Sequence, residues 1–237
     1  MRHPELHRWD VSQAEAVEMQ KRLRSQLDLP SGPVRIETVA GIDVSYDKGS
    51  DWLFAAIVVM RLPDLHVIET ASTTTLVPFP YVPGLLSFRE CPAVLQAWEK
   101  LQLKPDCLMC DGQGIAHPRR LGIASHLGLW LDMPSIGCAK SLLVGSYQEL
   151  GEKRGSTAPL IHRKEQVGVV LRTKDRVAPV FVSQGHKISL QQAVELVLAC
   201  CTKYRLPEPT RQAHLSVNEV RRQAGKKTQE DQQPTLL

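Results

Sequence analysis

The chain has 237 residues and a formal net charge of +4, with 43% apolar and 23% charged residues. This ordinary globular composition excludes a largely disordered protein, and the length suits one domain. The mild charge does not by itself indicate a nucleic-acid partner, because it equally suits other proteins. We expect one domain over residues 1–223 and a disordered tail over 224–237, where Lys, Gln, Glu, Asp and Pro dominate.

Export and membrane signals are missing from the sequence. The first thirty residues carry charges throughout, so they lack the apolar stretch of a signal peptide. The longest apolar run, Leu53 to Met60, is far shorter than the roughly 20 residues of a membrane-spanning helix. We therefore expect a cytoplasmic protein without membrane contact, and reduced, buried cysteines. Cys107 and Cys110 are too weak a pattern for zinc, since no second pair completes the site.

The first half of the chain predicts a helix followed by a meander. Val11 to Leu27 has the apolar spacing of an amphipathic helix. Three strand-like segments follow, over Val34 to Tyr46, Trp52 to Leu62 and Leu65 to Val77. Because only short turns separate them, they are expected to pair antiparallel.

Beyond the proline-rich loop of Pro78 to Pro83, helices and strands alternate, which is typical of parallel crossovers. The resulting fold class is α/β, a ribonuclease H-like mixed sheet in which an antiparallel three-strand meander is extended by parallel strands, with helices on both faces. The expected elements are helix Pro92 to Leu103, strand Cys107 to Cys110, helix Leu121 to Leu131, strands Ser135 to Ala139, Gln166 to Arg172 and Pro179 to Ser183, helix Leu190 to Tyr204 and a shorter helix from about Pro209.

Three acidic residues occupy positions that favour a metal site. Asp43 lies among apolar residues of an expected central strand, where an unpaired carboxylate is costly. Asp111 follows the strand Cys107 to Cys110, at the strand end where α/β sheets bind ligands. Glu90 precedes Pro92, which we expect in the first turn of a helix. Carboxylates in this number suit a hard cation such as Mg²⁺.

Each acid also has a simpler interpretation. Asp43 could be half of a buried ion pair, Asp111 a turn residue, and Glu90 a stabiliser of the helix dipole. Other catalytic motifs are missing: the sequence contains no G-x-S-x-G, Walker loop or H-E-x-x-H.

Six segments in unbroken order resemble endonuclease V, across roughly Val34 to His214. Several matching blocks carry more weight than any one motif. They are Gly41 to Val44, Pro80 to Gly84, Leu86 to Glu90, Asp111 to Gly114, His117 to Gly122 and Tyr204 to Pro209.

This resemblance implies a ribonuclease H-like nuclease that nicks strands containing deaminated purine, chiefly deoxyinosine in DNA. It implies cleavage of the second phosphodiester bond 3′ to the lesion, in DNA repair, leaving 3′-hydroxyl and 5′-phosphate ends. By motif, Asp43, Glu90 and Asp111 would bind Mg²⁺, for which Mn²⁺ could substitute, with His214 as a fourth catalytic residue.

The resemblance also assigns nucleic-acid contacts. The segment Pro80-Tyr81-Val82-Pro83 resembles the family's wedge, in which two prolines stiffen the loop that carries Tyr81; alone, it would read as a surface turn. The implied base pocket consists of Gly84, Leu86, Gly112 and Ile123. The implied phosphate contacts are Lys140, His117 and Arg119, of which the last two could also be a turn histidine and a solvated charge. Gln113 departs from the His or Asn common at its position.

Two rival functions remain open from the sequence. The same acids could serve a structure-specific ribonuclease H-like nuclease or a nuclease for inosine in RNA. A binding module without activity is a third alternative, which the retention of all three acids disfavours. We expect a monomer.

Overall fold

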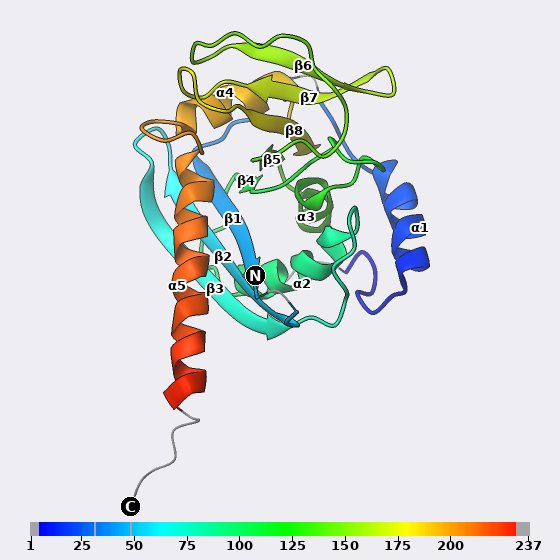
Figure 1. Ribbon diagram of the computed structural model, residues 1–237, viewed down its shortest axis with the longest axis vertical. Helices are drawn as coiled ribbons and strands as arrows, with labels where there is room; N and C mark the ends of the chain where they lie inside the picture. The colour runs from blue at the N-terminus through cyan, green and yellow to red at the C-terminus, as the bar shows by residue number, and fades with distance from the viewer. Residues whose placement is uncertain (1–4, 31, 48, 231–237) are drawn as a thin grey trace, which may run out of the picture.

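A mixed eight-stranded sheet organises the chain, in the order β3-β2-β1-β4-β5-β8-β7-β6 (Figure 1). The computed structural model describes residues 5–30, 32–47 and 49–230. The strands are β1 Thr38–Tyr46, β2 Trp52–Arg61, β3 His66–Leu76, β4 Cys107–Cys110, β5 Ser135–Ala139, β6 Thr157–His162, β7 Glu165–Leu171 and β8 Val180–His186.

The two halves of the sheet are built differently. β1, β2 and β3 form the predicted antiparallel meander, and β4 and β5 extend it in parallel. Beyond β5 the sheet differs from the predicted extension by parallel strands, because β8 pairs antiparallel with β5, and β7 and β6 continue the antiparallel pairing. β6 was not expected from the sequence; it is an edge strand with exposed alternate residues and contains Pro159, features that weaken the strand signal.

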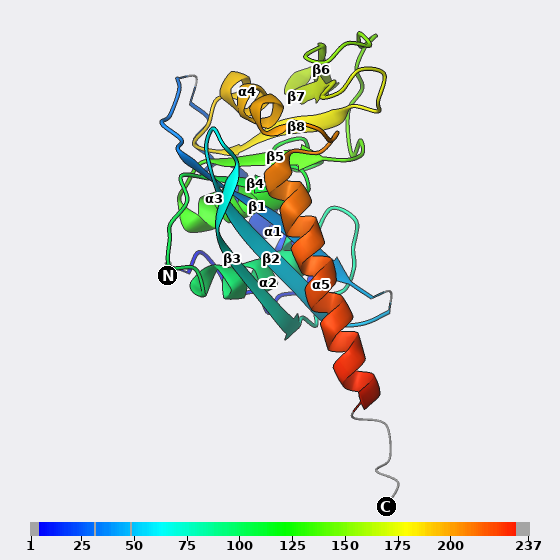
Figure 2. The same cartoon turned by 90° about the vertical axis from the view of Figure 1, so that its left-hand side faces the viewer.

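Helices cover both faces, as the fold class requires. The side chains of β1 alternate: Ala40 and Ile42 join the core under α2 and α3, whereas Val39 joins the core under α4 and α5. Figure 2 shows α5 crossing β1 and β2 and continuing past the end of the sheet. The helices are α1 Gln13–Arg24, α2 Leu86–Glu99, α3 Ile123–Leu131, α4 Leu190–Cys200 and α5 Glu208–Glu230.

Two helix boundaries differ from the predictions. The sequence placed the start of α2 at Pro92, but the helix begins at Leu86 and Pro92 lies inside it. The error came from treating proline as a helix start, whereas here the turn at Gly84, with φ +81°, precedes the helix. The short helix expected from Pro209 extends to Glu230, so the tail predicted from Ala224 is helical that far; residues 231–237 lie outside the described residues.

The sequence led to expectations for the cysteines and for membrane-spanning helices. All six cysteines are free and buried, as predicted. Cys107 and Cys110 join different cores, so they face opposite sides of the sheet. Across the described part of the chain, no helix is both long and apolar enough to cross a membrane.

Candidate active site

Two aspartates lie side by side on neighbouring strands, Asp43 inside β1 and Asp111 directly after the carboxyl end of β4. Ile42 pairs with Cys110 in the parallel ladder, and the amide of Asp111 continues it by donating to the Ile42 carbonyl at 3.0 Å. Asp43 and Asp111 are therefore neighbours across the two strands. Their side chains are 10% and 11% exposed, so both carboxylates are largely withdrawn from water.

Helix α5 brings His214 to the same place. It approaches β1 closely because Gly41 has no side chain: a Cβ there would lie 1.9 Å from the Pro209 carbonyl oxygen. His214 Nδ1 lies 2.7 Å from Asp43 Oδ2, and its Nε2 lies 3.0 Å from the Asn218 amide nitrogen. One ligand atom each from Asp43, Asp111 and His214 all fall within 4.8 Å of one another.

The site accumulates negative charge. Burial, and then the charge of Asp111, raise the pKa of Asp43, against the opposing effect of the hydrogen bond from His214. Glu90, which α2 presents, has a pKa raised to about 8 by burial and by the charges of Asp43 and Asp111. Crowded carboxylates of raised pKa are destabilised as anions. A divalent cation would relieve this, and oxygen donors with one imidazole fit such an ion.

A lysine from the next strand partly neutralises the acids. Lys140 follows β5, and its ammonium forms an ion pair with Asp111 while remaining 37% exposed. Its backbone is fixed by Arg205, whose guanidinium donates to the carbonyls of Lys140 and Pro179 at 2.8 and 2.7 Å. Lys140 is thus held beside the acids with its charged end open to solvent.

A pocket of about 360 Å³ opens next to the acids. The four residues predicted to form a base pocket, Gly84, Leu86, Gly112 and Ile123, all line it. A Cβ on Gly112 would lie 2.6 Å from Ile123 Cγ2, so glycine allows that close contact. The remaining lining residues are Tyr81, Pro83, Ser87, Glu90, Asp111, Gln113, His117, Leu121, Gly122, Ala139, Lys140, Ser141, Leu142 and Leu143.

The predicted wedge residues form the loop at the mouth of this pocket. Tyr81 is 56% exposed, flanked by exposed Pro80 and Pro83, while Val82 packs against the core. The loop is anchored by buried Arg89, which donates to the carbonyls of Phe79 at 2.5 Å and of Ser50 at 2.7 Å. The arrangement presents one aromatic ring on a fixed support.

His117 and Arg119, predicted as phosphate contacts, both bind the Gly84 carbonyl. His117 Nε2 lies 3.0 Å and Arg119 Nη2 lies 2.7 Å from this oxygen. His117 Nδ1 accepts from the Arg119 amide, so the ring is neutral and fully hydrogen-bonded. Burial lowers the pKa of His117 to about 4, which agrees with this assignment. The geometry gives both residues a role in positioning Gly84; phosphate contact stays a prediction.

Sequence reasoning missed a hydrogen-bonded chain behind the pocket. His7 Nδ1 contacts the Arg8 carbonyl, so it carries the proton and donates. His7 Nε2 must then accept from His126 Nε2 at 2.8 Å, and His126 Nδ1 must accept from the Ser87 hydroxyl at 3.0 Å. The Ser87 proton thus points away from the pocket that this residue lines. No motif spacing connects residues so distant in sequence.

Gln113, the departure noted in the sequence, has a structural role. Its amide nitrogen donates to the Ser141 carbonyl at 3.0 Å, which ties the turn after β4 to the segment after Lys140. Both ends of this contact line the pocket.

Comparison with known proteins identifies the family. A profile of endonuclease V matches residues 17–215. The chain is 54% identical over 223 residues to endonuclease V of Myxococcus xanthus, covering 94% of this chain and 95% of that protein. The chain belongs to the endonuclease V family. It is therefore a metal-dependent endonuclease.

Solved endonuclease V structures share the fold. The Streptomyces avermitilis protein is 44% identical with a TM-score of 0.87, covering 92% of this chain and 96% of that one. The Bacillus subtilis protein is 29% identical with a TM-score of 0.90, covering 96% and 100%. A Ciona intestinalis endonuclease V, 28% identical with a TM-score of 0.79 over 90% and 100%, is in complex with a 23mer DNA containing an inosine followed by a ribo-adenosine.

Proposed function

We propose that this endonuclease recognises deaminated purine, chiefly deoxyinosine in DNA, and hydrolyses the second phosphodiester bond on its 3′ side. The products would carry 3′-hydroxyl and 5′-phosphate ends, as a repair nick requires. The observation that carries the proposal is a base-sized pocket opening directly beside Glu90 and Asp111. The inosine-containing DNA bound to the Ciona intestinalis relative supports it.

We assign Asp43, Glu90 and Asp111 to hold Mg²⁺, for which Mn²⁺ can substitute. When bound, the ion supplies a water of lowered pKa and neutralises charge that develops on the phosphate. His214 Nδ1 donates to the Asp43 carboxylate, because the other ring nitrogen, Nε2, accepts from the Asn218 amide. His214 thereby orients one oxygen of Asp43.

Recognition rests on a pocket with a fixed wall. Hypoxanthine differs from adenine in carrying a carbonyl and an N1–H where adenine has an amine and a lone pair. Main-chain groups at Gly84, Leu86 and Gly112 can distinguish these edges by hydrogen-bond polarity. Tyr81 at the mouth would replace the stacking lost when the base leaves the strand. Lys140 would reach a phosphate next to the acids.

Cleavage mapping tests this proposal. Four end-labelled strands of one sequence, DNA and RNA, each with and without a single inosine, are incubated with Mg²⁺ and with EDTA. We expect metal-dependent cutting of the inosine-containing DNA at the second bond 3′ to inosine. Faster cutting of the RNA would make inosine-containing RNA the main substrate, and equal cutting of unmodified strands would favour a structure-specific nuclease.

A further inference from the structure

The β6–β7 hairpin closes with an unfavourable pair of residues. Its two-residue loop consists of Arg163 and Lys164, with φ of 55° and 66°. Turns in which both central residues have positive φ favour Asn-Gly, because a Cβ is strained in this conformation. Arginine and lysine therefore destabilise the turn relative to Asn-Gly, and retained strain of this kind is common at functional positions.

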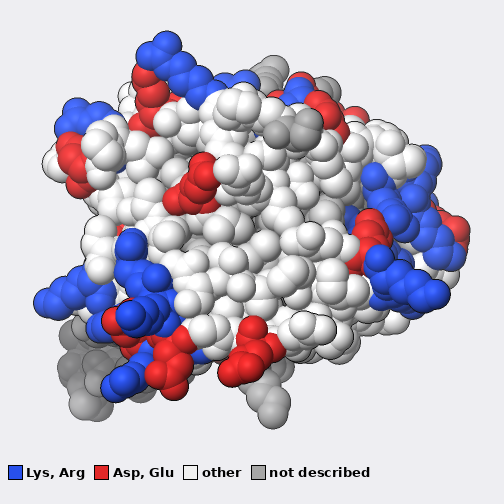
Figure 3. All heavy atoms as spheres, turned by 90° about the horizontal axis from the view of Figure 1, so that it is seen from above, with Lys and Arg blue, Asp and Glu red and all other residues white. Residues whose placement is uncertain are grey.

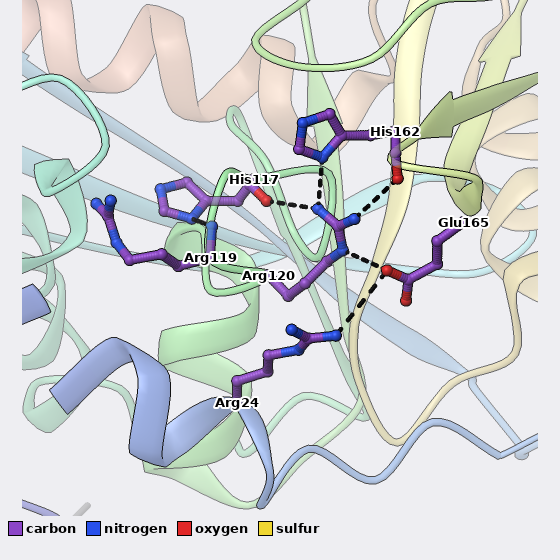
Figure 4. Close-up of polar contacts among 6 residues, drawn as sticks. All are labelled: Arg24, His117, Arg119, Arg120, His162 and Glu165. Carbon is purple, nitrogen blue, oxygen red and sulfur yellow. Dashed lines mark hydrogen bonds and ion pairs between the residues drawn. The ribbon is translucent and has the colours of Figure 1, made fainter. Parts of the chain in front are cut away.

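The turn is fixed to the wall of the pocket through a buried arginine (Figure 4). Arg120 donates to Glu165 Oε2 at 2.8 Å, and its Nη1 contacts His162 Nδ1 at 2.9 Å. These two partners flank the turn on either side. The same Arg120 nitrogen donates to the carbonyl of His117, the residue that holds Gly84. The turn and the pocket thus share one hydrogen-bonded support.

The charges of the turn are free while those beneath it are paired. Arg120 and Arg24 both approach Glu165, at 2.8 and 3.9 Å. Arg163 and Lys164 are exposed, and no ion pair or hydrogen bond joins them to any other residue that the structure describes. Seen from above, Lys and Arg side chains lie in separate groups around the rim of this face, with acidic side chains among them (Figure 3).

We propose that Arg163 and Lys164 contact backbone phosphates of the nucleic-acid strand whose base occupies the pocket. This inference rests on the proposed function, since it requires a bound strand. Two unpaired cations held at a fixed position relative to Gly84 suit a polyanion that passes the pocket. Such contacts position the strand without reading its bases. They also make affinity depend on salt, because each neutralised phosphate releases counterions.

Single-turnover cleavage of an inosine-containing strand at several KCl concentrations tests this inference. Arg163→Gln/Lys164→Gln removes both charges and keeps the strained conformation. Its maximal rate should equal that of wild type, while the half-saturating enzyme concentration rises about 2- to 30-fold. The slope of log affinity against log salt should become shallower by about 1 to 2.

Two further variants separate the contributions of charge and strain. Arg163→Asn/Lys164→Gly should lose as much affinity yet raise the thermal midpoint by about 2–4 °C, because the strain is relieved. Arg35→Gln/Lys104→Gln removes the same formal charge from residues that precede the amino ends of the central strands β1 and β4, whereas Asp111 follows the carboxyl end of β4, and it should change affinity less than about twofold.

Two outcomes would overturn the inference. They are wild-type affinity and salt slope in Arg163→Gln/Lys164→Gln, and an equal loss in the Arg35→Gln/Lys104→Gln control, which would indicate bulk charge. Failure of the wild-type protein to cut the inosine-containing strand would instead overturn the proposed function.

Discussion

Two sides of one pocket bury ionisable groups in opposite ways. The acidic edge consists of Asp43, Glu90 and Asp111, and there burial, followed by the charges of neighbouring carboxylates, raises the pKa values of Asp43 and Glu90. The histidine wall consists of Ser87 and His117, which line the pocket, and His126 behind them, and its hydrogen bonds require both imidazole rings to be neutral. The two sides therefore have different roles. The acidic edge needs a cation to offset its negative charge, whereas the hydrogen bonds of the histidine wall are satisfied without a ligand and give the pocket a fixed shape.

The largest effect is expected from neutralising the acidic edge. Asp43→Asn and Asp111→Asn should each reduce the cleavage rate by at least about 1000-fold. A cation that is held by fewer carboxylates stabilises the transition state less, by several kcal/mol. Binding of the inosine strand should stay measurable in a gel-shift assay. Substantial Mg²⁺-dependent cutting by either variant would remove that residue from the metal site.

Substitution of Tyr81 in the wedge tests whether extrusion of the base is independent of the chemistry at the acidic edge. Tyr81→Ala should weaken binding of inosine in duplex DNA about 5- to 150-fold, since stacking on an aromatic ring is worth about 1 to 3 kcal/mol per base. Inosine in single strands should be affected less, because an unpaired base leaves its stack more easily. Tyr81→Phe serves as the control and should resemble wild type. Equal losses on both substrates would indicate a role in folding or through the hydroxyl.

Because His117 of the histidine wall is buried in its neutral form, the folded protein should lose stability in acid. With a pKa of about 4 in the folded protein against 6.5 unfolded, His117 stays neutral in the fold and takes up a proton on unfolding. Its contribution is present above pH 6.5 and is lost as pH falls toward 4. Between pH 7 and 5 this amounts to about 2 kcal/mol.

The matched variant is His117→Gln, whose amide can still donate to Gly84 but does not titrate. Urea unfolding of both proteins at pH 7 and pH 5 should show the smaller pH dependence in the variant. Identical pH dependence would mean that His117 is not the group responsible.

The sequence predicted the acidic edge better than the wall. Local apolar patterns placed Asp43 inside a central strand and Asp111 at a strand end, and the parallel pairing of β1 with β4 brings the two together. The position of Glu90 was approximate, because the start of α2 was misplaced by six residues. The contacts from His7 to His126 and from Arg120 to His162 were not predictable, since they join segments 119 and 42 residues apart without a spacing rule.

With Glu90 at a pKa of about 8, the acidic edge should stay partly protonated until a divalent cation binds. Calorimetric titration of the protein with Mg²⁺ at pH 7, in buffers of different ionisation enthalpy, measures this directly. With the pKa of Glu90 at about 8 in the metal-free protein, wild type should release about one proton per site on binding. Glu90→Gln should release almost none. Mg²⁺ binding by wild type without proton release would contradict the account.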